Sequence, residues 1–249
     1  MASRSAILLG VLATCLAAGA HAADIRVLSA AAVQVPVTEA AQQFMRETGH
    51  RVTFEFATGG QVDEKLSAGA HPDVVINSSG RIAARTSANP ADAAAVRDLG
   101  TVRIGVAARN GAARPDLSSA ARFRDALVRA ESITYGDPAR GATTGIHFSR
   151  IVDQLDLRGI LADKTILAAN GLDVVQKVVR GEAELGITQV SEILHVDASI
   201  LVGPLPDALQ LATAYVAWTP DPGNRAAREL VEALTARQGR ERFRAAGFD

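Results

Sequence analysis

Residues 25–56 read IRVLSAAAVQVPVTEAAQQFMRETGHRVTFEF, in which two β-rich runs flank a helical one. The runs Ile25–Leu28 and Val52–Phe56 are short, apolar and rich in β-branched and aromatic residues, which is typical of buried strands. Between them, Val35–Thr48 has the spacing of an amphipathic helix, and Gly49 follows as a stop signal. This strand–helix–strand unit predicts parallel strands with a helix on one face of the sheet. The apolar positions of the helix are Val37, Ala40, Ala41, Phe44 and Met45.

The same alternation continues along the chain and predicts an α/β protein. Only the alanine-rich stretch Ala83–Val96 resembles a linker, and a chain of 249 residues favours two small lobes over one large sheet. Further strands are predicted at Val74–Ile76, Arg103–Ala108, Ile133–Tyr135, Ile166–Ala168, Leu185–Thr188, Ile200–Val202 and Ala212–Ala217. Further helices are predicted at Gln61–Ala68, Ser119–Ala130, Gly145–Leu155, Leu172–Arg180 and Arg225–Thr235, with a shorter one from Gly239.

The first residues have the pattern of a secretory signal peptide. Arg4 precedes an apolar run, and Ala20-His21-Ala22 is a small-residue cleavage site, so we predict a leader over residues 1–22 and a periplasmic mature protein. The alternative, a membrane anchor, needs an apolar run of about 20 residues, and this run is shorter. Cys15, the one cysteine, lies inside the leader, so the mature chain is predicted to lack disulfides and thiolate chemistry.

Composition excludes several classes of function. The chain has 26 Lys+Arg against 27 Asp+Glu and only 4% aromatic residues, which argues against nucleic-acid binding. The histidines show no close ligand pairs, and no nucleophile elbow, phosphate loop or dinucleotide fingerprint is present, so we expect no metal and no cofactor.

Loops rich in small and hydroxyl residues follow several predicted strands. In α/β proteins the loops beyond the carboxyl ends of strands collect ligands, and backbone N–H groups at helix starts favour anions. The alternative for any one loop is plain N-capping, which uses the same residue types. The residues that we predict to bind a ligand in these loops are Ser29, Ala30, Thr58, Gly59, Ser78, Ser79, Thr143 and Thr144.

Two arginines stand beside these loops. Arg81 directly follows the Ser78-Ser79-Gly80 loop, and Arg140 precedes Gly141. A guanidinium can hold a carboxylate through two parallel hydrogen bonds, so either side chain is a candidate ligand clamp. The alternative is a solvated surface arginine.

The order of motifs resembles that of the periplasmic molybdate-binding proteins of the type II solute-binding class. The resemblance rests on IRVLSAAA at 25–32, Phe44, TG at 48–49, GAHPDV at 69–74, YGDPA at 135–139, GEAELGI at 181–187 and VGPLP at 202–206. It implies a two-lobed fold with two crossover strands and a ligand cleft between the lobes. On that model, residues 23–102 plus 212–249 form lobe one and residues 103–211 form lobe two.

Three ligand positions implied by the resemblance lack the hydroxyl that the family carries. The serine of the first loop corresponds to Ala32, the serine of the second loop to Gly59, and the tyrosine after the later strand to Gln189. Since an oxyanion held by neutral donors loses affinity with each missing partner, we expect a carboxylate rather than molybdate as the ligand. Gln189 is included in the predicted ligand-binding set.

Two functions compete at this stage. The first is a monomeric periplasmic binding protein that captures a small anion for an ABC-type importer. The second is an isomerase, because the sequence also resembles the aconitate isomerase branch of this fold. Proton transfer beside a carboxylate needs one acid–base group and no cofactor, for which we consider His147 and Glu192, and also His71.

Overall fold

The structure, a computed structural model, describes residues 22–249. The predicted leader lies outside the described residues, apart from Ala22. The strands are β1 Asp24–Ala30, β2 Arg51–Ala57, β3 Val74–Ser78, β4 Val96–Ala108, β5 Ile133–Gly136, β6 Thr165–Ala168, β7 Leu185–Gln189, β8 Leu201–Pro204 and β9 Ala212–Trp218. The α-helices are α1 Gln34–Thr48, α2 Gly59–Ser67, α3 Ser79–Thr86, α4 Pro90–Ala94, α5 Ala120–Arg129, α6 Thr143–Gln154, α7 Arg158–Leu161, α8 Gly171–Val179, α9 Val190–Asp197, α10 Arg225–Thr235 and α11 Arg237–Ala245.

The strands form one curled sheet in the order β2-β1-β3-β9-β4-β7-β5-β6, with β8 paired to β4. The pairs β1–β2, β1–β3, β5–β6 and β5–β7 are parallel, as the strand–helix alternation predicts. The pairs that involve β4 or β9 are antiparallel, so the sheet is mixed rather than wholly parallel.

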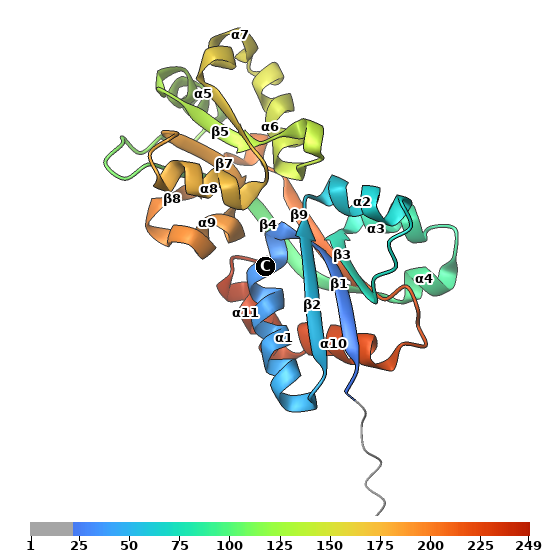
Figure 1. Ribbon diagram of the computed structural model, residues 1–249. Coiled ribbons are helices and arrows are strands. Elements are labelled where there is room, and N and C mark those ends of the chain that lie inside the picture. The colour runs from blue at the N-terminus through green and yellow to red at the C-terminus, as the bar shows by residue number, and fades with distance from the viewer. Residues whose placement is uncertain (1–21) are drawn as a thin grey trace, which may run out of the picture.

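Strands β4 and β9 run between two groups of helices and strands (Figure 1). Strand β4 is unusually long. Its residues from Val96 to Arg103 pair with β9, and those from Ile104 to Ala108 pair with β7. One strand thus belongs to both halves of the sheet, and the molecule has two lobes joined by crossing strands.

Each lobe has helices on both faces of its part of the sheet. In the first lobe, α1, α10 and α11 bury one face around Phe44 and Phe243, while α2 and α3 cover the other face with Val62 and Ile82. In the second lobe, Phe123 and Phe148 lie at the centre of the larger core. The C-terminal helices pack on α1, and Phe248 forms a bridge to Val102.

The predicted strands all occur, and the differences lie at helices and boundaries. The stretch Ala83–Val96, which we expected to be a linker, contains the end of α3 and all of α4; Asn89 caps α4 and Pro90 occupies its first turn. Helix α9 was not predicted, because no turn residue separates it from the preceding strand. At its start Glu192 accepts a hydrogen bond from Gln189 N, which is the glutamate half of a capping box.

The lobe boundaries stay a proposal. We propose residues 23–102 with 212–249 as lobe one and residues 103–211 as lobe two. The register of β4 supports this division, since its pairing partner changes from β9 to β7 between Arg103 and Ile104.

We expect the crossing strand to contribute strongly to stability. Ile104 lies on β4 with none of its surface exposed, so Ile104→Ala removes fully buried methyl groups and should lower the free energy of unfolding by about 2–5 kcal/mol. Ile160 on α7 is 43% exposed, and Ile160→Ala should change the free energy of unfolding by only about 0.5 kcal/mol. Urea denaturation of both variants tests this; equal losses would contradict the importance of the crossing strand.

Candidate functional site

A cavity lies where loops of the two lobes meet. Its lining comes from the ends of β1, β2 and β7, from Tyr215 in the middle of β9 and from the starts of helices in both lobes. Strand ends and helix starts meet there because each of these helices follows a strand directly or after a short loop. The lining residues are Ala30, Ala31, Ala32, Ala57, Thr58, Gly59, Ala142, Thr143, Thr144, Asn170, Gly171, Gln189, Glu192 and Tyr215.

Helix starts supply the principal electrostatic feature of the cavity. The first turns of α2, α6 and α8 contribute lining residues, as does the 3₁₀ turn η1 (Ala31–Val33) that precedes α1. The first N–H groups of a helix have no partner inside the helix and carry partial positive charge. The cavity is therefore suited to a negatively charged group.

Capping side chains accept hydrogen bonds from some of these N–H groups and leave other N–H groups without a side-chain acceptor. Thr58 accepts a hydrogen bond from Gln61 N at the start of α2, and Asn170 accepts one from Asp173 N at the start of α8. In contrast, the cap residues of η1 and α6, Ala30 and Ala142, make no side-chain cap hydrogen bond. Plain capping thus explains Thr58, whereas the N–H groups at the starts of η1 and α6 remain available to a ligand.

Thr143 and Thr144 occupy the first turn of α6 rather than its cap position. The hydroxyl of Thr144 makes no hydrogen bond to another group of residues 22–249, and the residue is 6% exposed. Because Thr144 lines the cavity and its hydroxyl can donate a hydrogen bond, Thr144 is a candidate donor to a ligand.

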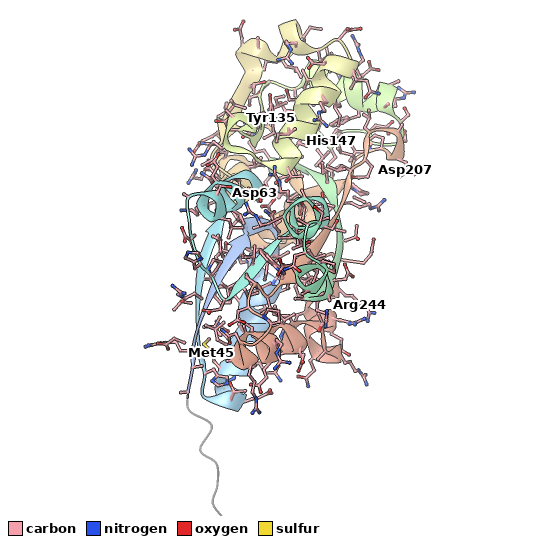
Figure 2. The ribbon with its side chains drawn as sticks, turned by 90° about the vertical axis from the view of Figure 1, so that its right-hand side faces the viewer. Met45, Asp63, Tyr135, His147, Asp207 and Arg244 are labelled. Carbon is pink, nitrogen blue, oxygen red and sulfur yellow. The ribbon has the colours of Figure 1, made fainter. Side chains whose placement is uncertain are left out.

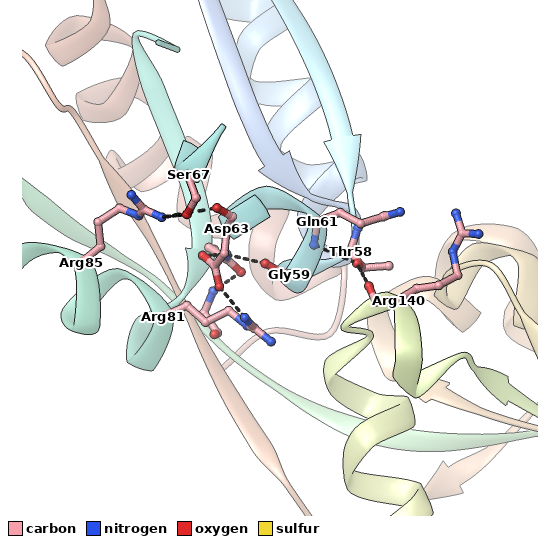
Figure 3. A network of polar contacts seen from close by, with 10 residues as sticks. Thr58, Gly59, Gln61, Asp63, Ser67, Arg81, Arg85 and Arg140 are labelled. Atoms are coloured by element: carbon pink, nitrogen blue, oxygen red, sulfur yellow. Dashed lines mark hydrogen bonds and ion pairs between the residues drawn. The ribbon is translucent and has the colours of Figure 1, made fainter. Parts of the chain in front are cut away.

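The two lobes touch at one side of the cavity. The hydroxyl of Thr58 donates to the backbone oxygen of Arg140 (Figure 3). Gly60 N donates to Gly141 O at 3.1 Å. A Cβ on Gly60 would lie 2.6 Å from Gly141 Cα, so only residues without a side chain allow this approach. These contacts hold the loops of the two lobes together beside the cavity.

Neither candidate arginine lines the cavity. Arg81 forms an ion pair with Asp63 on α2 and lies against Gly59, while the exposed Arg140 side chain extends away from Thr58 (Figure 3). The arginine clamp expected from the sequence is therefore not formed in this structure. Arg81 is held by Asp63 because the two side chains face each other from neighbouring helices.

Three of the predicted serines also lie outside the lining. The buried hydroxyl of Ser29 donates to Ala30 O, while Ser78 ends β3 and Ser79 begins α3. By contrast, the structure brings together Ala30, Thr58, Gly59, Thr143, Thr144 and Gln189 around the cavity.

The three candidate acid–base residues lie in different parts of the structure. Glu192 lines the cavity, whereas His147 and His71 do not. His147 lies on α6 within the second lobe (Figure 2), and its Nε2 is 2.9 Å from Leu209 O, to which it donates. His71 is exposed on the loop before β3.

Glu192 belongs to a buried polar network. Its Oε2 accepts hydrogen bonds from the Thr188 hydroxyl at 2.5 Å and from Gln189 N at 3.2 Å. The carboxyl lies against Gly171, where a Cβ would come within 1.9 Å of Glu192 Oε2. Burial raises the pKa of Glu192, and the two hydrogen bonds oppose that shift only in part.

Tyr215 was missed by sequence reasoning. Its hydroxyl oxygen accepts a hydrogen bond from Gln189 Nε2 at 2.8 Å, and burial together with the nearby Glu192 raises the pKa of the phenol. The residues expected from the sequence lie in loops after strands, whereas Tyr215 lies inside β9. The signal was weak: a tyrosine, one of two in the chain, within an otherwise apolar strand.

The described residues form neither a metal site nor a membrane-spanning helix. In residues 22–249 no three His, Cys, Asp or Glu side chains are grouped so that they could hold a metal ion. No helix in the same range is long and apolar enough to cross a membrane.

Comparison with known proteins identifies the family. The model of the bacterial extracellular solute-binding proteins matches residues 25–249, and the chain belongs to this family. An aconitate isomerase from Pseudomonas sp is 29% identical over 247 residues, which cover 94% of this chain and 91% of that protein. The molybdate-binding protein ModA of Mycobacterium bovis is 26% identical over 237 residues, 91% of this chain and 85% of that protein.

Solved structures confirm the fold class. The periplasmic molybdate-binding protein of Azotobacter vinelandii superposes with a TM-score of 0.73 at 18% identity, over 90% of this chain and 98% of that chain. The resemblance to molybdate-binding proteins that we inferred from the sequence motifs is thus confirmed.

The contact between the lobes gives a prediction. Gly60→Ala places a methyl group against Gly141 and should force the two loops apart, which increases the radius of gyration in small-angle scattering and lowers stability. Gly80→Ala is the matched control, because a Cβ at Gly80 on α3 meets no atom within 4 Å. The control should raise the free energy of unfolding by up to about 1 kcal/mol through helix propensity alone. Identical behaviour of the two variants would show that the loops do not need this approach.

Proposed function

We propose that this protein binds a small anion in the cavity between its lobes and delivers it to an ABC-type importer in the periplasm. The observation that carries the proposal is the convergence of helix starts from both lobes on one cavity with no Lys, Arg or His among its lining residues. Such a site recognises negative charge through backbone dipoles and neutral donors. Membership of the solute-binding family supports the transport role. A monomeric state remains a prediction from the sequence.

Closure of the lobes strengthens this kind of binding. A hydrogen bond to an anion gains strength when water is excluded, because the effective dielectric constant falls. Donors from α2 and η1 in one lobe and from α6 and α8 in the other can surround the ligand only when the loops meet. The contacts of Thr58 and Gly60 with the loop at Arg140 and Gly141 correspond to such a closed arrangement.

We infer that the anion is a carboxylate rather than molybdate. Ala32, Gly59 and Gln189 line the cavity, and these are the positions at which the resemblance to molybdate-binding proteins implies side-chain hydroxyls. The support expected from arginine is absent, since neither Arg81 nor Arg140 lines the cavity. The preference therefore rests on the missing hydroxyls and on the similarity to an aconitate isomerase.

A ligand panel tests the binding function. Citrate, cis-aconitate or trans-aconitate should raise the melting temperature of the mature protein more than molybdate, tungstate or sulfate. At a ligand concentration of about 100 Kd the stabilisation is about 2.7 kcal/mol, which corresponds to roughly 5–10 °C for a chain of this size. Stabilisation by molybdate alone would contradict the carboxylate preference.

Thr144 provides a check on the location of the site. Thr144→Val keeps the shape of the side chain but removes the hydroxyl beside the ligand, which should weaken binding by about tenfold. Thr53→Val, on an exposed position of β2, is the matched control and should bind as the wild type does. If both variants bind equally well, the ligand does not use the start of α6.

A second candidate function is aconitate isomerisation. Two observations favour it: the 29% identical relative with this name, and the Glu192 carboxyl in the lining of the cavity. Isomerisation between cis- and trans-aconitate needs a group that removes and returns a proton next to a carboxylate. Glu192, with its raised pKa, is suited to that role, whereas His147 is engaged with Leu209 O outside the cavity.

Ultraviolet absorbance of cis-aconitate mixed with the purified protein distinguishes the two functions. An isomerase should convert it, and Glu192→Gln should slow the conversion by about 10²–10⁴-fold because the proton carrier is removed. His147→Gln is the control and should retain turnover. Tight binding without turnover would support the transport function and contradict the isomerase.

A further inference from the structure

The Glu192 carboxyl uses only one of its oxygens within the protein. Thr188 and Gln189 both donate to Oε2, and no hydrogen bond from residues 22–249 reaches Oε1. The side chain is 5% exposed and lines the cavity. Capping of α9 uses only Oε2, so Oε1 remains free to contact a ligand in the cavity.

The charged side chains near Glu192 supply no unpaired cation. From β9 the facing titratable group is Tyr215, which is neutral when protonated, and on α3 the nearby Arg81 is paired with Asp63. On α8, which packs against α9, Asp173 pairs with Lys177 and Arg180, and these three form no ion pair with Glu192.

The other titratable side chains on α9 are Asp197 and His195. Asp197 accepts hydrogen bonds from Ser199, and His195 is exposed. The turn η1, which also contacts α9, has no titratable side chain.

This environment decides which form of the carboxyl is compatible with an anion. An ionised Glu192 beside a bound anion would place two negative charges together in a buried cavity without a cation. A neutral carboxyl has the opposite effect, since Oε2 continues to accept from Thr188 and Gln189 while Oε1–H becomes a donor. Burial favours the same neutral form because it raises the pKa of Glu192.

We propose that Glu192 is a specificity-determining residue that binds in its protonated form and donates Oε1–H to an oxygen of the bound anion, so that anion affinity depends on this proton. The proposal rests on the proposed function, because it assumes that the anion occupies this cavity. Tyr215, whose hydroxyl oxygen accepts a hydrogen bond from Gln189, is a second neutral hydroxyl in the cavity lining. The anion then binds more weakly at pH values at which the Glu192 carboxyl is ionised.

The protonation state is tested first without any ligand. A carboxyl whose pKa is higher in the folded than in the unfolded chain destabilises the fold as pH rises from the ordinary glutamate range towards the raised value, since the unfolded chain ionises first. The melting temperature of Glu192→Gln minus that of the wild type should therefore increase between pH 5 and pH 8. Glu39→Gln, at an exposed position of α1, should show no such trend. A difference that stays constant or falls with pH overturns the proposal.

The donor role is tested by calorimetric titration of the wild type and Glu192→Gln with cis-aconitate and with sulfate. The wild-type affinity should fall as pH rises above the pKa of Glu192, with a limiting slope of tenfold per pH unit. Glu192→Gln, whose amide nitrogen can donate permanently, should bind with little dependence on pH; any slope that it shows for cis-aconitate belongs to the ligand and is subtracted.

The outcomes separate this proposal from the proposed function. Binding by the wild type that does not depend on pH, or loss of binding by Glu192→Gln at every pH, overturns the donor role and leaves anion binding standing. If neither anion binds to either protein at any pH, both the proposed function and the donor role fail.

Discussion

Strand β4 is the element on which the rest of the structure depends. Its first part hydrogen-bonds to β9 and its second part to β7, so a single continuous backbone fixes both halves of the sheet. Because β1, β2, β5, β6 and β7 each lead towards a helix near the junction, the position of β4 determines which helix starts face each other. The cavity is a consequence of this register rather than of any one binding residue.

A site built in this way differs physically from a site of charged side chains. The chain has a net charge of −1, so it has no long-range positive field that would attract an anion from solution. Selectivity must arise at short range, where N–H groups and hydroxyls have fixed directions and water is excluded. The arginines contribute elsewhere: Arg81 holds α2 and α3 together through Asp63, close to Gly59 at the edge of the cavity.

Much of the fold could be predicted from the sequence because it depends on local periodicity. The runs at Ile25–Leu28 and Val52–Phe56 are strands, and the loops that follow them do lead into helix starts. The side chains that define the site depend on tertiary contacts and were harder to predict. Arg81 was a plausible clamp until its pairing with Asp63 was known, and Tyr215 lies within a strand, where a search of loops does not find it.

Glu192 shows how a local rule and a tertiary constraint combine at one residue. The backbone N–H of Gln189 at the start of α9 needs an acceptor, and Glu192 satisfies it through Oε2. That requirement alone would allow the side chain to lie in solvent. The absence of a side chain at Gly171 instead lets the carboxyl pack against the first turn of α8, inside the cavity. The same hydrogen bonds that start α9 therefore also fix the direction of the free oxygen, and the geometry of the candidate site follows from the way the helix begins.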